Sequence, residues 1–135
     1  MDKAVSKNIS LIIRDKNMDT NPLIKLLELE NVKFYNKGEK ISRVIPAFEE
    51  DVLIYTFEIE EDIDNAISDF VSKIKECMDY DKIIQKYEEV KIRLYIQTME
   101  AQAQIVLSHK SMMLLESLKV KFEISLFSWG GVIDE

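Results

Sequence analysis

The sequence predicts an α+β fold, a two-layer domain in which a mainly antiparallel sheet carries about three helices packed on one face. Segments with alternating apolar side chains, which indicate strands, are interspersed with amphipathic segments of helical period. Only three glycines and two prolines interrupt these patterns, and no linker or low-complexity tract divides the chain. The 135 residues are therefore expected to form one domain, 1–135, around a single core.

The N-terminal part of the chain begins with a strand in residues 7–14, where every second side chain is apolar. A helix is expected over residues 20–30, because Pro22 suits a first helical turn, in which its missing N–H is not needed. A short strand follows at 32–35, and the polar segment 36–38 then forms a turn.

The middle of the chain carries the clearest periodicity. Residues 52–59 are apolar on both sides for part of their length, which indicates an interior strand. Residues 63–78 have the spacing of an amphipathic helix, with Cys77 on its apolar face as a buried, unreactive thiol. A kink is expected near Asp79, and residues 90–97 then alternate as a strand with one buried and one solvated face.

The C-terminal part is expected to contain a further strand, a helix and a last strand. Residues 104–107 form a short apolar run that indicates a strand. Ser108 is a suitable cap for a helix in which Met112 and Met113 fill the core beside leucines. The final strand is expected over residues 120–127, again with apolar side chains on one face.

Two segments of the chain resemble each other. Residues 26–34 match residues 114–122 at six of nine positions, and each passes from a leucine-rich helix into a strand without a glycine. One explanation is a duplicated helix–strand unit, which would give a ferredoxin-like core with a pseudo-twofold repeat. The other explanation, which we favour, is that two similar packing problems selected similar residues.

The residue types argue against catalysis and against a bound cofactor or metal. His109 and Cys77 are the sole histidine and cysteine, so one chain cannot supply a structural zinc site. The acidic segments lack the glycine turn of a calcium loop, and neither a nucleophile elbow nor a phosphate-binding loop is present. We therefore expect no catalytic residues, no cofactor and no metal.

Charge is concentrated in one part of the chain. The formal net charge is -7, whereas residues 49–64 alone hold eight acids and no Lys or Arg. An acidic domain is a poor nucleic-acid binder, so Lys91, Arg93 and Tyr95 are expected to form a solvated strand face. The acids instead favour a basic protein partner. The candidate partner-binding residues are Glu49, Glu50, Asp51, Glu58, Glu60, Glu61 and Asp62.

The expected location is the cytoplasm, without membrane association. A single cysteine fits a reducing compartment, and no apolar run approaches the ~20 residues of a membrane span. The N-terminus also lacks the apolar stretch of a signal peptide.

The chain resembles a small bacterial family known only as a domain of unknown function. The similarity rests on the Pro-capped helix followed by the turn Lys37-Gly38-Glu39, on the long middle helix between two strands, and on the C-terminal leucine helix running into a strand. Members often have a tryptophan in the strand after that turn, where this chain has Tyr55 and Phe57. The resemblance implies no established activity and no site residues.

These observations favour a non-catalytic protein-binding module, in its most concrete form an immunity-type inhibitor whose acids meet a basic toxin. One alternative is a small-ligand-binding or enzymatic domain with a cleft between sheet and helices. A deep pocket with converging carboxylates, Tyr55 or Arg93 would favour this alternative. Another is a self-associating structural domain that uses an exposed sheet edge or the solvated face bearing Tyr95.

Overall fold

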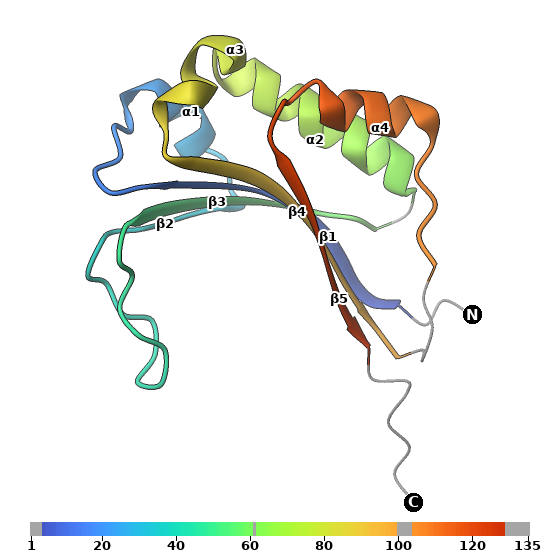
Figure 1. Cartoon of the computed structure of the whole chain (residues 1–135). Coiled ribbons are helices and arrows are strands. Elements are labelled where there is room, and N and C mark those ends of the chain that lie inside the picture. The colour runs from blue at the N-terminus through green and yellow to red at the C-terminus, as the bar shows by residue number, and fades with distance from the viewer. Residues whose placement is uncertain (1–3, 61, 100–103, 129–135) are drawn as a thin grey trace, which may run out of the picture.

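The computed structural model describes residues 4–60, 62–99 and 104–128, which form an α+β domain of one sheet and one helical layer (Figure 1). The five strands lie in the order β2-β3-β1-β4-β5. Three of the four pairings are antiparallel and the pairing of β4 with β5 is parallel. The strands are β1 (Ala4–Asp15), β2 (Val32–Tyr35), β3 (Asp51–Glu58), β4 (Glu89–Thr98) and β5 (Lys121–Ser128). The α+β, mainly antiparallel prediction is thus confirmed.

The helices lie together over one face of the sheet, as predicted (Figure 1). They are η1 (Asn21–Leu23), α1 (Ile24–Leu27), α2 (Ile63–Cys77), α3 (Tyr80–Ile83), η2 (Ile84–Lys86) and α4 (His109–Glu116). The break expected near Asp79 separates α2 from α3. The helix expected over 20–30 is shorter than predicted, a single 3-10 turn followed by one α-helical turn, and its Thr20 side chain makes no capping hydrogen bond.

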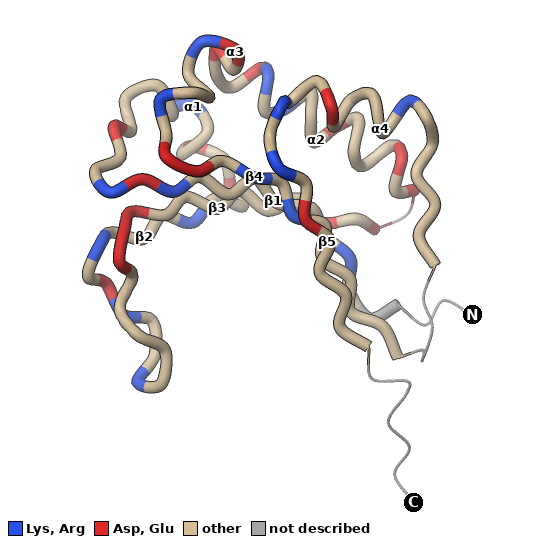
Figure 2. Tube along the Cα trace, in the orientation of Figure 1, with Lys and Arg blue, Asp and Glu red and all other residues tan. Residues whose placement is uncertain are grey.

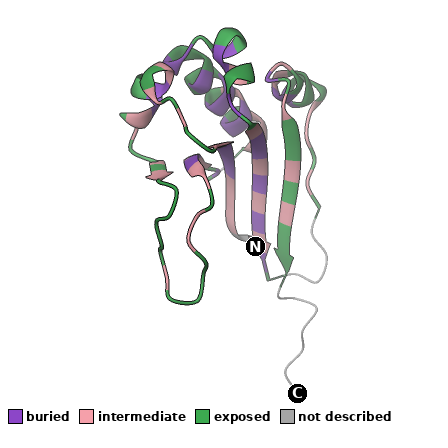
Figure 3. Ribbon diagram, turned by 60° about the vertical axis from the view of Figure 1, so that its left-hand side comes forward, coloured by how far each residue is buried: buried purple, intermediate pink, exposed green. Residues whose placement is uncertain are grey.

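The central strand β1 owes its position to apolar side chains on both faces. Ile9, Leu11 and Ile13 point toward the helices and are fully buried, while Ile12 on the opposite face is 2% exposed. Phe70 on α2 is also fully buried and lies over the sheet, with its ring 5.7 Å from that of Tyr55. Figure 3 shows these buried residues concentrated in β1, β4 and the inner sides of the helices.

A carboxylate joins α2 to the start of α4. The Asp64 Oδ1 atom accepts hydrogen bonds from the Ser111 hydroxyl at 2.5 Å and from the Ser108 backbone N–H at 3.1 Å. Ser108 in turn caps α4, because its hydroxyl oxygen accepts from the Ser111 N–H, as the sequence predicts. The hydrogen bonds from Ser111 and Ser108 hold the pKa of Asp64 below its ordinary value.

The lowered pKa of Asp64 predicts a loss of stability in acid. As the pH falls through about 4, the unfolded chain takes up a proton at Asp64 before the folded chain does, so the free energy of unfolding decreases. Urea unfolding at pH 7 and pH 3 should therefore show a smaller pH dependence for Asp64→Asn than for Asp69→Asn, the matched change at an exposed position of α2. Equal pH dependence of the two variants would contradict this role of Asp64.

Two predictions about the C-terminal part are wrong. Residues 104–107 form no strand, because β5 occupies the edge of β4. Ile105 and Leu107 nevertheless pack against the core, so the apolar run that indicated a strand belongs to a segment that packs on the core without pairing. Met112 and Met113 do not fill the core either, since they are 51% and 57% exposed.

The two similar segments are not structurally equivalent. The first enters β2, which pairs antiparallel with β3, whereas the second enters β5, which pairs parallel with β4. Lys119 turns the second segment into its strand with a φ of 54°, in the left-handed region, while the matching Asn31 does not adopt a positive φ. The sheet therefore lacks the pseudo-twofold repeat of a ferredoxin-like core.

Candidate functional site

The seven acids singled out in the sequence do not form one surface. Asp51 begins β3 and Glu58 ends it, so the strand separates the two groups by about 23 Å at the usual rise per residue. Figure 2 shows acidic residues at both ends of this strand. Glu61 lies outside the described residues. The first group (Glu49, Glu50 and Asp51) and the second group (Glu58, Glu60 and Asp62) therefore belong to separate surfaces.

Asp51 has a structural role in the first group. Its carboxylate accepts hydrogen bonds from the backbone N–H groups of Lys37 at 2.8 Å and Met18 at 3.0 Å. The bonds from Met18 and Lys37 lower the pKa of Asp51. Asp51 thus ties the 15–20 turn to the hairpin of residues 36–50, and it is already engaged within the chain. Glu49 is exposed and Glu50 half-buried on that hairpin.

The second group surrounds a hollow at the opposite end of β3, which we call the acidic hollow. It has a volume of about 540 Å³. Its acidic side chains are Glu58, Glu60, Asp62 and Asp69, and all four residues are exposed. Phe57 and Ala66 supply apolar surface, and the Phe57 ring packs edge-on against Phe70 at 6.3 Å. A rim of negative charge therefore surrounds a partly apolar floor.

The carboxylates of the acidic hollow are not neutralised by basic side chains. None of the ion pairs between described residues involves Glu58, Glu60, Asp62 or Asp69. Among the described residues that line the hollow there is no Lys or Arg. Asp62 has one local task, since it caps α2 by accepting a hydrogen bond from the Asp64 N–H at 2.9 Å. The local field at this end of the sheet is therefore negative and open to solvent.

Sequence reasoning missed Asp69 as a member of this group. Asp62, Asn65 and Asp69 follow one another at spacings of three and four residues, which place them on one side of α2. That spacing is visible in the sequence, although only the fold brings Glu58 and Glu60 to the same hollow.

The strand face predicted to be solvated around Lys91 and Arg93 lies on the side of the sheet without helices, but Lys91 is only 9% exposed there and Arg93 is half-buried. The Arg93 Nε atom is 2.6 Å from Glu123 Oε1. The Lys91 Nζ atom lies 3.5 Å from Glu123 and 3.6 Å from Glu89. Arg93 also lowers the pKa of Glu123. Lys91 and Arg93 are thus both paired with carboxylates, which makes these two cations less available to phosphate groups.

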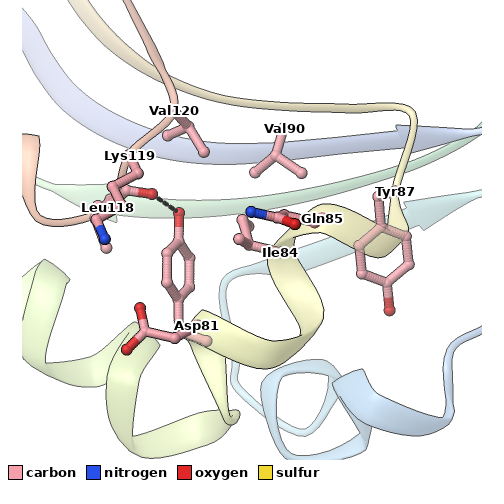
Figure 4. Close-up of a pocket in the computed structure, with 9 residues that line it drawn as sticks. Asp81, Ile84, Gln85, Tyr87, Val90, Leu118, Lys119 and Val120 are labelled. Carbon is pink, nitrogen blue, oxygen red and sulfur yellow. Dashed lines mark hydrogen bonds between the residues drawn. The ribbon is translucent and has the colours of Figure 1, made fainter.

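A cavity between the sheet and the helices has a volume of about 250 Å³ (Figure 4). It is smaller than the ~300–1,000 Å³ of typical small-molecule sites. The Tyr80 hydroxyl beside it donates a hydrogen bond to the Leu118 carbonyl, drawn as the dashed line in Figure 4. Burial raises the pKa of Tyr80, and burial raises that of Tyr87 to about 12. Both phenols are therefore protonated donors near neutral pH rather than general bases.

The other residues considered for chemistry lie apart. Tyr55 is 4% exposed within the core, and Arg93 lies on the helix-free face, so they do not converge. Cys77 is buried, which raises the pKa of its thiol, and His109 is exposed at the start of α4. Over the described ranges, no three His, Cys, Asp or Glu side chains are grouped as a metal ion would require.

Within the described residues, none of the helices is long and apolar enough to cross a bilayer. No protein-family model, no curated protein and no solved structure matches the chain.

Proposed function

We propose that the protein is a non-catalytic protein-binding module whose acidic hollow receives a basic protein. The observation that carries the proposal is the set of four exposed carboxylates around one hollow, with no basic side chain among the described residues that line it. Such a surface attracts a cationic partner from a distance and accelerates encounter at low ionic strength.

The floor of the hollow adds a reason for a protein partner with Lys or Arg side chains. Phe57 is half-buried beside the carboxylates. A guanidinium group placed between them would make charge-assisted hydrogen bonds with the carboxylates and lie near an aromatic ring. Apolar contact with Phe57 and Ala66 would accommodate the aliphatic stem of the same side chain.

The concrete form of the proposal is an immunity-type inhibitor that covers a basic surface of a toxin in the cytoplasm. Its support is the charge of the hollow and the acidic character of the chain as a whole, -7. Membership of the bacterial family of unknown function is likewise a proposal, and it rests on the motifs quoted above.

A pair of charge-reversed variants tests the proposal. Glu58→Lys/Glu60→Lys changes the acidic hollow, and Glu49→Lys/Glu50→Lys makes the same charge change at the other end of β3. Both leave Asp62 in place as the cap of α2 and Asp51 in its hydrogen bonds. Immobilised wild-type protein should retain a basic protein from a lysate of the source organism at low salt and release it at high salt.

The hollow variant should lose this protein and the hairpin variant should keep it. Circular dichroism of both variants establishes that they are folded. Equal retention by the two variants, or retention that does not depend on salt, would contradict binding through the acidic hollow.

A further inference from the structure

The edge strand β5 exposes apolar side chains on the face that the other strands bury. Phe122, Ile124 and Leu126 lie beside Ile92, Leu94 and Ile96 of β4 and point to the helix side of the sheet. The β4 residues are at most 3% exposed, whereas Phe122 is 39%, Ile124 54% and Leu126 52% exposed. Figure 3 shows β5 exposed along much of its length beside the buried strands. Within the part of the chain that the structure describes, the core layer therefore continues to the sheet edge with these three side chains exposed.

The two edges of the sheet differ in their protection. At the opposite edge, β2 has only four residues and is followed by the hairpin of residues 36–50. Short edge strands discourage pairing with another chain. By contrast, β5 has eight residues, no proline and only two charged side chains, Lys121 and Glu123. Among the described residues, no strand lies beyond β5 in the sheet.

Charge favours a second copy of the chain at this edge. The chain carries -7 in total, so the net charges of two copies repel each other. Residues 109–128, which hold α4 and β5, do not add to this repulsion, because their three lysines and two glutamates give +1. A basic partner would be drawn to the acidic hollow instead.

We infer that two copies of the chain associate by antiparallel pairing of β5 with β5 around a twofold axis at Ile124. In this register Ile124 faces Ile124 and Phe122 faces Leu126, so all three apolar side chains on the helix side gain an apolar partner. Glu123 faces Ser125, so no like charges meet. A register centred on Glu123 would oppose two glutamates, and one centred on Ser125 would place Phe122 opposite Ser128.

The helical layer extends the same contact. A stable dimer buries roughly 1,200–2,000 Å² in total, which requires contacts beyond one pair of strands. The helix α4 lies above the β5 edge (Figures 1 and 3) and carries the exposed Met112 and Met113. Since the twofold axis keeps both helical layers on one face of a continuous ten-stranded sheet, each α4 flanks the interface. This inference is independent of the proposed function of the acidic hollow.

Sedimentation of the full chain tests the association. The wild-type protein, of 15.8 kDa, should sediment as a dimer of twice that mass. Ile124→Asp should be a folded monomer, because it places two carboxylates opposite each other at the axis. The matched control is Ile41→Asp in the hairpin, where the side chain is 53% exposed, and this variant should remain dimeric.

Cysteine variants test the register, each in a Cys77→Ala background. In the proposed pairing the Cα atoms of two Ile124 residues lie about 4.5–5.5 Å apart, within the range that a disulfide spans. Two Ser125 residues are displaced along the strands and lie about 8 Å apart, which is too far. Mild oxidation should therefore cross-link Ile124→Cys and leave Ser125→Cys uncross-linked. A wild-type monomer at the highest soluble concentration, a dimer insensitive to Ile124→Asp, or preferential cross-linking through Ser125→Cys would overturn the inference.

Discussion

Replacing Phe70 by alanine is expected to lower the free energy of unfolding by about 3–5 kcal/mol. The side chain is fully buried, and its ring packs against both Tyr55 and Phe57 between α2 and β3. Alanine would remove these contacts and leave a cavity at the centre of the core, which the surrounding strands can close only partly.

Urea unfolding followed by circular dichroism measures this loss. The matched control is Phe48→Ala, the same substitution in the projecting hairpin, where the ring is half-buried and stacks on Tyr35 at 4.7 Å. The control should cost less than half as much. If the two substitutions were equally destabilising, α2 would not be anchored to the sheet through Phe70.

Replacing Tyr80 by phenylalanine is expected to lower the free energy of unfolding by about 1–3 kcal/mol. The Tyr80 hydroxyl donates a buried hydrogen bond to the Leu118 carbonyl at 2.5 Å. Phenylalanine would keep the packing and leave that carbonyl without its donor. Because Leu118 precedes the left-handed turn at Lys119 and the start of β5, the bond fixes the entry of the chain into the edge strand.

The same urea measurement tests this bond, with Tyr35→Phe as the matched control at the opposite edge of the sheet. The control should change stability by less than about 0.5 kcal/mol, since Tyr35 is only half-buried. A Tyr80→Phe variant as stable as the control would mean that the hydrogen bond to Leu118 makes no net contribution.

Much of the fold follows from local patterns in the sequence. Helix α2 and strand β4 have strict periodicities over many residues, and the structure has both within one or two residues of the predicted bounds. Residues 104–107 form an apolar run of strand type but pair with no strand, because pairing depends on the order of the strands in the sheet. The exposure of Met112 and Met113 could not be predicted for a related reason. The depth to which α4 is buried depends on the exposed edge strand beneath it.

The candidate site was predictable only in part. Sequence reasoning found Glu58, Glu60 and Asp62, because their charges cluster along the chain. It also grouped them with Glu49, Glu50 and Asp51, which an eight-residue strand holds at a distance. Proximity in sequence does not give proximity in space when a strand intervenes, and Asp69 joins the hollow through the helical spacing instead.

The central claim is that the acidic hollow binds a basic protein by electrostatic attraction. The most direct test is the association rate constant of the retained protein with wild type, Glu58→Lys/Glu60→Lys and Glu49→Lys/Glu50→Lys, measured across ionic strength. We expect the hollow variant to associate about tenfold more slowly than wild type at low salt and to show a weaker salt dependence, while the hairpin variant stays closer to wild type. Equal rates for the two variants at every salt concentration would contradict the claim.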